Sequence, residues 1–151
     1  MNTKKADEKS VMISIRGAQN TDDEDDVIEF ITAGEFYKSD TGYEISYIET
    51  ELTGMEGTET RLSVEGRRIT MMRTGRFSTQ MIFEKGQKHL ALYETPAGTL
   101  LVGVNASSVD IDLDDKGGRL AVDYSVEIDH VLTGYNRFEL KVHKAGDSLP
   151  Q

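Results

Sequence analysis

Between Gly42 and Gly98 the chain has a glycine-containing turn every nine to twelve residues, and polar and apolar side chains alternate between these turns. Because successive side chains of a β-strand point to opposite faces, this alternation indicates strands with one buried face. Short, evenly spaced strands joined by tight turns are typical of a β-sandwich or a closed barrel. The chain is therefore expected to be all-β.

The same pattern extends along the rest of the chain and predicts about ten strands. Asp22–Asp26 is expected to be an acidic loop, and Gly34 to mark a bulge in the next segment. The start of that segment, Val27–Ile31, also fits one helical turn. The predicted strands are 11–16, 27–37, 43–47, 58–65, 68–74, 79–83, 89–93, 100–104 continuing through Asn105–Ser107 to 109–113, 120–128 and 138–142.

The connections are short enough to join neighbouring antiparallel strands in a meander, which closes more naturally into a barrel than into a Greek-key sandwich. Closure also removes exposed strand edges. We therefore predict a single closed or nearly closed antiparallel up-and-down β-barrel of about 8–10 strands. The predicted boundaries are a tail at 1–9, the barrel at 10–144 and a second tail at 145–151.

Charge and composition narrow the class of partners. The net charge of −10 argues against general nucleic-acid binding, because the phosphate backbone would repel the chain. From Gly57 to Leu90, however, seven basic residues accompany three acidic ones. The chain has no cysteine and no apolar stretch behind Met1–Lys5, which predicts a cytoplasmic protein without a membrane span.

Several segments of the chain resemble a known family. They are Tyr47, Glu49, Thr53–Gly57, Thr60, Arg73–Gly75, Met81–Gly86, Tyr93–Gly98 and Tyr124. With these residues the chain resembles the YwiB-like family, small bacterial proteins that form a domain of unknown function. The resemblance covers about residues 10–143 and implies a lipocalin-like (calycin) β-barrel and a cytoplasmic location. It implies no activity.

The alternation of the strands places two opposite charges on inward faces. Glu49 has the phase of Ile45, and Arg73 has the phase of Met71. Burying both charges is costly unless they pair. One interpretation is a polar clamp at one end of a ligand cavity, and the other is a structural ion pair that plugs the barrel end or lies at its solvated rim. The predicted ligand-binding residues are Tyr47, Glu49, Thr60, Arg73, Tyr93 and Tyr124.

Other candidate chemistry finds little support. Asp110–Asp115 fails the calcium-loop pattern, because aspartate stands where glycine is needed at the sixth position. His89, His130 and His143 lack the spacing of zinc ligands. No catalytic residue, metal or cofactor is predicted. A cluster of methionines fits either core packing or an adaptable apolar ligand surface, and its members are Met55, Met71, Met72 and Met81.

Three hypotheses for function follow. The first is a non-enzymatic barrel that binds a small, partly apolar ligand inside, with an anionic group facing Arg73. The second is an interaction module that binds an acidic partner or RNA through basic hairpins, with Arg61, Arg67, Arg68, Arg76, Lys85 and Lys88 as its patch. The third is a catalytic barrel, which needs a cleft with convergent titratable groups.

Overall fold

The computed structural model of the chain describes residues 9–21, 24–53, 56–75 and 78–144. Ten strands account for most of these residues, together with a short 3₁₀ turn at Glu51–Thr53. The strands are β1 (Lys9–Thr21), β2 (Glu24–Lys38), β3 (Gly42–Ile48), β4 (Glu59–Glu65), β5 (Arg68–Thr74), β6 (Thr79–Glu84), β7 (Lys88–Thr95), β8 (Gly98–Asp114), β9 (Gly117–Ile128) and β10 (Val131–Lys144).

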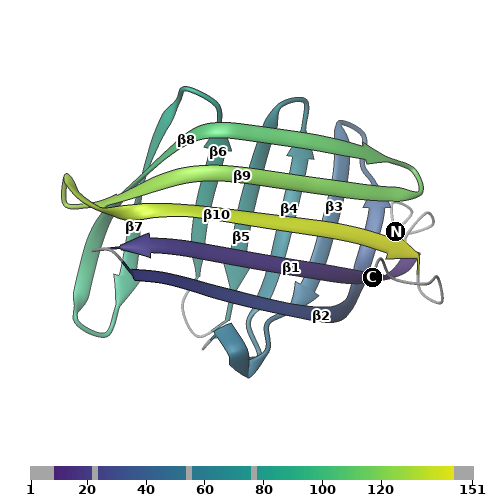
Figure 1. Cartoon of the computed structure of the whole chain (residues 1–151), viewed down its shortest axis with the longest axis horizontal. Helices are drawn as coiled ribbons and strands as arrows, with labels where there is room; N and C mark the ends of the chain where they lie inside the picture. Colours follow the sequence, from purple (N-terminus) through teal and green to yellow (C-terminus); the bar gives the residue numbers. More distant parts are fainter. Residues whose placement is uncertain (1–8, 22–23, 54–55, 76–77, 145–151) are drawn as a thin grey trace.

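The strands form one antiparallel sheet that is nearly closed on itself. The strand order in the sheet is β6-β5-β4-β3-β2-β1-β10-β9-β8-β7. The first and last strands of the chain, β1 and β10, therefore pair with each other, and their register begins with Val11 opposite Lys144. Between β6 and β7 the sheet is joined only by the isolated bridge from Glu84 to Gln87. The long strands β8, β9, β10, β1 and β2 lie across the front, and β3 to β6 cross behind them (Figure 1). The predicted up-and-down meander barrel is confirmed.

The core lies between these two layers and is built from the inward half of each strand. The alternation predicted from the sequence places Leu120 and Val122 of β9 in the core with no exposed surface. Three aromatic rings pack at its centre, with the Phe83 ring centroid 4.8 Å from that of Tyr124 and 5.4 Å from that of Phe138. Such tilted and edge-to-face pairs favour a fixed side-chain arrangement.

Gly34 does not mark a bulge, which corrects the expectation from the sequence. It pairs in register with Val11 on one side and Tyr47 on the other. A Cβ atom added to it would lie 2.4 Å from Ile13 Cδ1 and 2.4 Å from the backbone oxygen of Ser46. The glycine is therefore required by close packing between neighbouring strands. The segment around it is extended throughout and contains no helical turn.

The β8 strand is continuous through Asn105–Ser107, as expected, with a register shift against β9 between Ala106 and Ser108. One other local expectation changes. The alternation of residues 120–128 puts Ala121 on the face expected to meet solvent, but Ala121 is buried. It stands between the longer Asp110 and Glu139 on the two neighbouring strands, which leave its methyl group little exposed surface.

The expected acidic loop is shorter than the sequence suggested, because β2 already begins at Glu24. Asp22 and Asp23 lie outside the described residues, as do both predicted tails apart from Lys9, which belongs to β1. In the part of the chain that is described, no helix is long and apolar enough to cross a bilayer.

Candidate functional site

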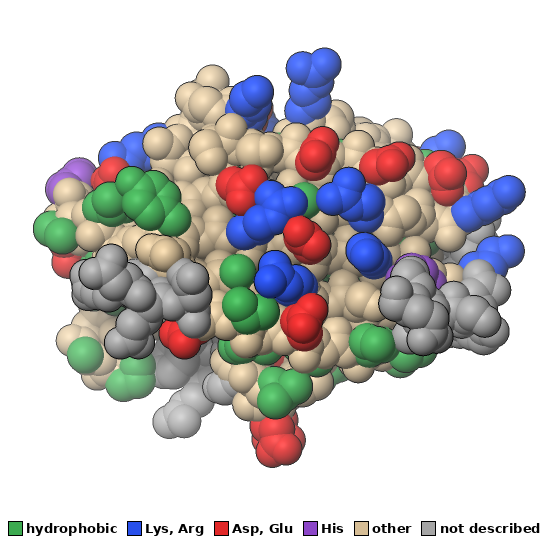
Figure 2. All heavy atoms as spheres, in the orientation of Figure 1, with side chains coloured by type: hydrophobic (Ala, Val, Ile, Leu, Met, Phe, Trp, Pro, Cys, Tyr) green, Lys and Arg blue, Asp and Glu red, His purple; other side chains and the backbone are tan. Residues whose placement is uncertain are grey.

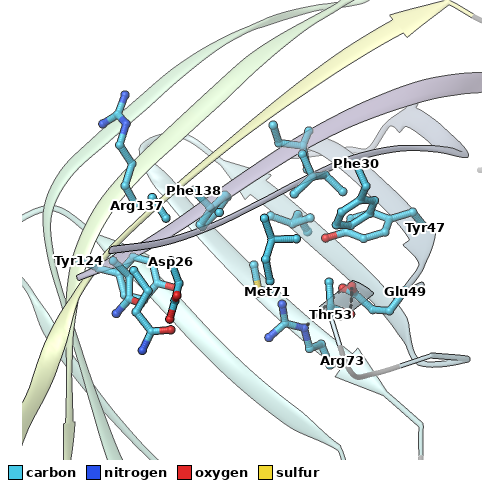
Figure 3. Close-up of a pocket in the computed structure, with 18 residues that line it drawn as sticks. Asp26, Phe30, Tyr47, Glu49, Thr53, Met71, Arg73, Tyr124, Arg137 and Phe138 are labelled. Carbon is cyan, nitrogen blue, oxygen red and sulfur yellow. Dashed lines mark hydrogen bonds and ion pairs between the residues drawn. The ribbon is translucent and has the colours of Figure 1, made fainter. Parts of the chain in front are cut away.

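A pocket of about 230 Å³ opens into the barrel between the long front strands and the back strands β3 to β5. Most of its wall is apolar, and polar side chains gather near Glu49 and Arg73 at one side (Figure 3). The lining residues are Ile15, Gly17, Ala18, Gln19, Asp26, Ile28, Phe30, Tyr47, Glu49, Thr53, Leu62, Met71, Arg73, Tyr124, Asn136, Arg137, Phe138 and Leu140.

Glu49 is held at the point where the chain leaves β3. Its backbone N–H donates to the carbonyl of Thr58 at 2.7 Å, and its carbonyl accepts from Gly57 N–H at 3.3 Å. These two bonds close the segment between β3 and β4 and fix the carboxylate toward the pocket. The residue is only 3% exposed. An isolated carboxylate at this depth would be strongly unfavourable, so its partners decide whether the site is stable.

Hydroxyl groups satisfy the Glu49 carboxylate. Thr53 Oγ1 donates to Oε1 at 3.1 Å, and Thr60 Oγ1 donates to Oε2. Thr60 comes from β4 with no exposed surface, and Thr53 comes from the 3₁₀ turn. The carboxylate therefore keeps its hydrogen bonds whether or not a cation is close by.

Arg73 approaches the same carboxylate from β5 without hydrogen-bonding to it. Its Nε lies 3.7 Å from Glu49 Oε2, and this buried nitrogen has no hydrogen-bond partner. The guanidinium extends from β5 toward the side of the pocket where Tyr124 and Asp26 lie (Figure 3). The Arg73 side chain is one-quarter exposed. Its terminal amino groups are thus presented to the pocket with donors in a planar fork.

Three tyrosines are close enough to Arg73 for its charge to act on them. Burial raises the pKa of the Tyr47, Tyr93 and Tyr124 hydroxyls, in the case of Tyr93 to about 12. The positive charge of Arg73 works in the opposite direction on all three and only partly offsets the burial. At neutral pH these groups are therefore uncharged hydroxyls that can donate hydrogen bonds.

The structure brings together four of the six residues predicted to bind a ligand. Tyr47, Glu49, Arg73 and Tyr124 line the pocket, and Thr60 supports Glu49 from behind. Tyr93 does not line it. The Tyr93 side chain lies in the gap between β6 and β7, where its hydroxyl donates to the carbonyl of Gln80 at 3.3 Å.

Sequence reasoning missed the wall opposite Arg73. Phe30 and Phe138 come from the long strands β2 and β10, and Asp26 and Asn136 come from the same two strands. The signal available for Phe138 was its inward phase with Leu140. Phase alone does not tell how far along the barrel a residue lies, so the pocket could not be distinguished from the packed core.

The family named "Domain of unknown function (DUF1934)" matches residues 13–140 of the chain. The chain belongs to the DUF1934 family. The match includes every residue of the Glu49–Arg73 site. The resemblance to YwiB-like proteins drawn from the residues is thereby confirmed.

Two comparisons place this DUF1934 chain among known proteins. It is 27% identical over 121 residues to the uncharacterized beta-barrel protein YwiB of Bacillus subtilis (strain 168), covering 80% of this chain and 84% of that protein. The crystal structure of the ywiB protein from Bacillus subtilis has a TM-score of 0.81, with 22% sequence identity over 92% of this chain and 94% of that chain. That similarity supports the barrel fold.

Only part of the predicted basic patch lies together in the DUF1934 barrel, at a groove that Arg67, Lys85 and Glu84 line. Arg68 pairs with Glu84 at 3.6 Å, Arg61 with Glu59 at 3.4 Å, and Lys88 with Glu127 at 2.6 Å. Arg76 lies outside the described residues. Binding of an acidic partner or RNA stays a prediction.

The front face of the barrel carries charges of both signs. Figure 2 shows Lys and Arg side chains interleaved with Asp and Glu over the long front strands. Arg137 is typical: although it borders the pocket, it points away from it (Figure 3). Asp123 at 2.7 Å and Glu139 at 2.9 Å hold its guanidinium, and the hydrogen bond to Asp123 raises its pKa.

The remaining candidates from the sequence are placed as follows. Asp110, Asp112 and Asp114 are exposed on β8, and no cluster of three or more potential metal ligands occurs among the described residues. Met71 lines the pocket and is nearly buried, whereas Met72 faces solvent. Met81 packs against the core, and Met55 lies outside the described residues.

Proposed function

We propose that this protein binds, without catalysis, a small and partly apolar ligand whose anionic group is held by Arg73 inside the barrel. The observation that carries the proposal is the Arg73 guanidinium, whose buried Nε lacks a hydrogen-bond partner and whose terminal groups face an apolar-walled pocket. Buried polar groups in native proteins are nearly always hydrogen-bonded. An anion beside the guanidinium would supply the missing acceptors.

The hydrogen bonds that Glu49 accepts leave Arg73 available for an anionic ligand. The carboxylate accepts hydrogen bonds from the hydroxyls of Thr53 and Thr60 and does not need the guanidinium as a hydrogen-bond donor. Arg73 can therefore turn its fork toward a carboxylate, sulfonate or phosphate, for which it is well shaped. The neutral Tyr124 hydroxyl at the same pocket adds a donor that does not repel an anion.

The rest of the pocket selects the apolar part of the ligand. Phe30, Leu62, Met71, Phe138 and Leu140 give an apolar wall beyond the polar side. A volume of about 230 Å³ is below the usual range for drug-sized ligands, which favours a compact molecule. A medium-chain carboxylate or a small aromatic acid has the required combination of groups. We also propose a calycin-like barrel acting in the cytoplasm, in keeping with the lack of cysteine.

The test measures the binding of octanoate and of octanol directly by isothermal titration calorimetry. Three proteins are compared: the unaltered chain, Arg73→Met and Gly17→Leu. Gly17 lines the pocket, and an added Cβ there would have no neighbour within 4 Å, so leucine fills the cavity without disturbing the polar residues. The control is Arg61→Met, which removes an arginine that does not line the pocket.

We expect the unaltered chain and Arg61→Met to bind octanoate, and to bind it more tightly than octanol. Gly17→Leu should abolish binding, and Arg73→Met should remove the preference for octanoate. Binding that survives Gly17→Leu would place the octanoate elsewhere and refute the proposal. Native mass spectrometry of protein purified from its own cells, compared with the denatured mass, then identifies any natural ligand.

A further inference from the structure

The inner face of the front layer carries a row of polar side chains across four neighbouring strands. The register places Gln19 of β1 opposite Asn136 of β10 on one side and opposite Asp26 of β2 on the other. Asn136 in turn lies opposite Tyr124 of β9. All four residues line the pocket, so their side chains point into the barrel. We call Asp26, Gln19, Asn136 and Tyr124 the polar row.

The polar row borders an apolar wall on the same strands. Two residues along each strand from the polar row lies one apolar row, and two residues further lies a second. Their members are Ile28, Gly17 and Phe138 in the first, and Phe30, Ile15 and Leu140 in the second. Because two residues of an antiparallel strand span about 6.8 Å, the pocket changes from polar to apolar over that distance.

The fold does not use the polar groups of this row. Among the residues that the structure describes, none of the four side chains forms a hydrogen bond or an ion pair with another residue. Glu49 differs, because its carboxylate accepts hydrogen bonds from Thr53 and Thr60. The polar row therefore presents one hydroxyl, two carboxamides and one carboxylate to the pocket.

Arg73 faces this end of the pocket from the opposite layer. Figure 3 shows its guanidinium directed toward the side where Tyr124 and Asp26 lie. Burial raises the pKa of the Tyr124 hydroxyl, and the positive charge of Arg73 lowers it, so the guanidinium is near enough to act on the polar row. An anionic group bound by Arg73 would therefore lie beside the polar row, with the apolar part of the ligand against the apolar rows.

Asp26 is the member of the polar row that restricts the ligand most. Asn136 and Tyr124 are half-buried, whereas Gln19 and Asp26 are exposed, so Asp26 lies at the solvent end of the row. A carboxylate in this position repels a ligand that carries only negative charge. A ligand with a positive group near its anionic group turns the repulsion into attraction. An ammonium group suits Asp26 well, because it brings three hydrogen-bond donors to an acceptor-only carboxylate.

We propose that the ligand is a zwitterion, an apolar amino acid or a short peptide, with its carboxylate on Arg73 and its ammonium at Asp26. This inference rests on the proposed function, because it takes the anionic group to be held by Arg73. In an amino acid the ammonium stands next to the carboxylate. In a dipeptide a peptide group lies between them, and the carboxamides of Gln19 and Asn136 can hydrogen-bond to it.

Two matched pairs of compounds isolate the effect of the ammonium. 3-Phenylpropanoate is phenylalanine without its ammonium group, and N-acetylphenylalanine is glycylphenylalanine without its ammonium group. All four keep the carboxylate and the apolar ring. Isothermal titration calorimetry gives the Kd of each compound for the unaltered chain, Asp26→Asn and Glu29→Gln. The control residue Glu29 is also on β2, but it pairs with Arg16 at 3.5 Å and does not line the pocket.

We expect at least one zwitterion to bind the unaltered chain about fivefold more tightly than its matched anion, the gain typical of a solvent-exposed ion pair. Asp26→Asn should remove this preference without weakening the matched anion, and Asp26→Lys should reverse it. Glu29→Gln should keep it. A preference for phenylalanine identifies an amino acid as the ligand, and a preference for glycylphenylalanine alone identifies a peptide.

The failure of this inference is distinct from the failure of the proposed function. Equal affinities within both pairs, with binding that still depends on Arg73, overturn the zwitterion and leave the proposed function standing. A preference for the zwitterion that survives Asp26→Asn also overturns the inference, because the ammonium would then bind elsewhere. If octanoate and all four compounds fail to bind, both proposals are overturned.

Discussion

The Arg73–Glu49 pair predicts an asymmetric loss of stability when either partner is removed. Arg73→Met leaves a carboxylate that is 3% exposed without its cation. Breaking a buried pair in this way costs about 3 kcal/mol. Glu49→Gln leaves the guanidinium, which is one-quarter exposed and can be solvated through the pocket. This second change should cost only about 1.5 kcal/mol.

The coupling between the two residues can be worked from their separation. At 3.7 Å, with an effective dielectric constant of about 20, Coulomb's law gives an attraction of about 4.5 kcal/mol. Solvent at Arg73 and the hydroxyls around Glu49 reduce this attraction. We therefore expect a coupling free energy of about 1.5 kcal/mol, so that the double variant loses about 3 kcal/mol rather than the sum of the single losses.

Urea unfolding followed by circular dichroism measures the free energy of unfolding of the unaltered chain, Arg73→Met, Glu49→Gln and the double variant. The matched control is Arg61→Met, because Arg61 pairs with Glu59 at the surface and its loss should cost less than about 1 kcal/mol. Strictly additive single variants, with Arg73→Met no more destabilising than Arg61→Met, would refute the reasoning. The guanidinium would then not be acting on the buried carboxylate.

Two further predictions concern packing and pH. Gly34→Ala should lower the free energy of unfolding by about 2–3 kcal/mol, because its Cβ would overlap Ile13 and the Ser46 backbone. The control is Gly17→Ala, whose Cβ would meet no neighbour, and it should change the free energy of unfolding by less than about 1 kcal/mol. Equal effects of the two changes in urea unfolding would contradict the close-packing argument. Burial raises the pKa of Tyr93 from 10.0 to about 12, and those of Tyr47 and Tyr124 in the same direction, so unfolded tyrosines lose their protons first. Stability should hold below about pH 10 and fall as the pH rises toward 12, and an unchanged urea midpoint across that window would count against burial of these hydroxyls.

The alternation of side chains was sufficient to predict the architecture. A strand has a side-chain period of two, so the run from Leu120 to Ile128 identified which face of β9 is buried. The same rule placed Glu49 and Arg73 on inward faces from different strands. Their meeting followed because β3, β4 and β5 are successive strands of a meander, in which local turns fix the register.

What the sequence could not provide was the depth of each residue and the contacts between distant strands. Tyr93 has the inward phase expected of a pocket residue, but it lies beside β6 at the open edge. Phe30 and Phe138 reach the pocket only because β1 brings β2 and β10 into one layer. Gly34 looked like a bulge because a glycine in a strand has several causes, and the crowding by Ile13 depends on the pairing partner.

The pairing of β1 with β10 also has a consequence for synthesis of the chain. The β1–β10 pairing joins Val11 to Lys144, far apart in the sequence, and it cannot form until β10 has left the ribosome. Strands β1 to β6 can assemble earlier from contacts between neighbours, but β1 then offers a long, unpaired edge while it waits. A nascent chain of this protein is therefore most exposed to misassociation along β1, and a chaperone that shields that strand would speed production of the folded barrel.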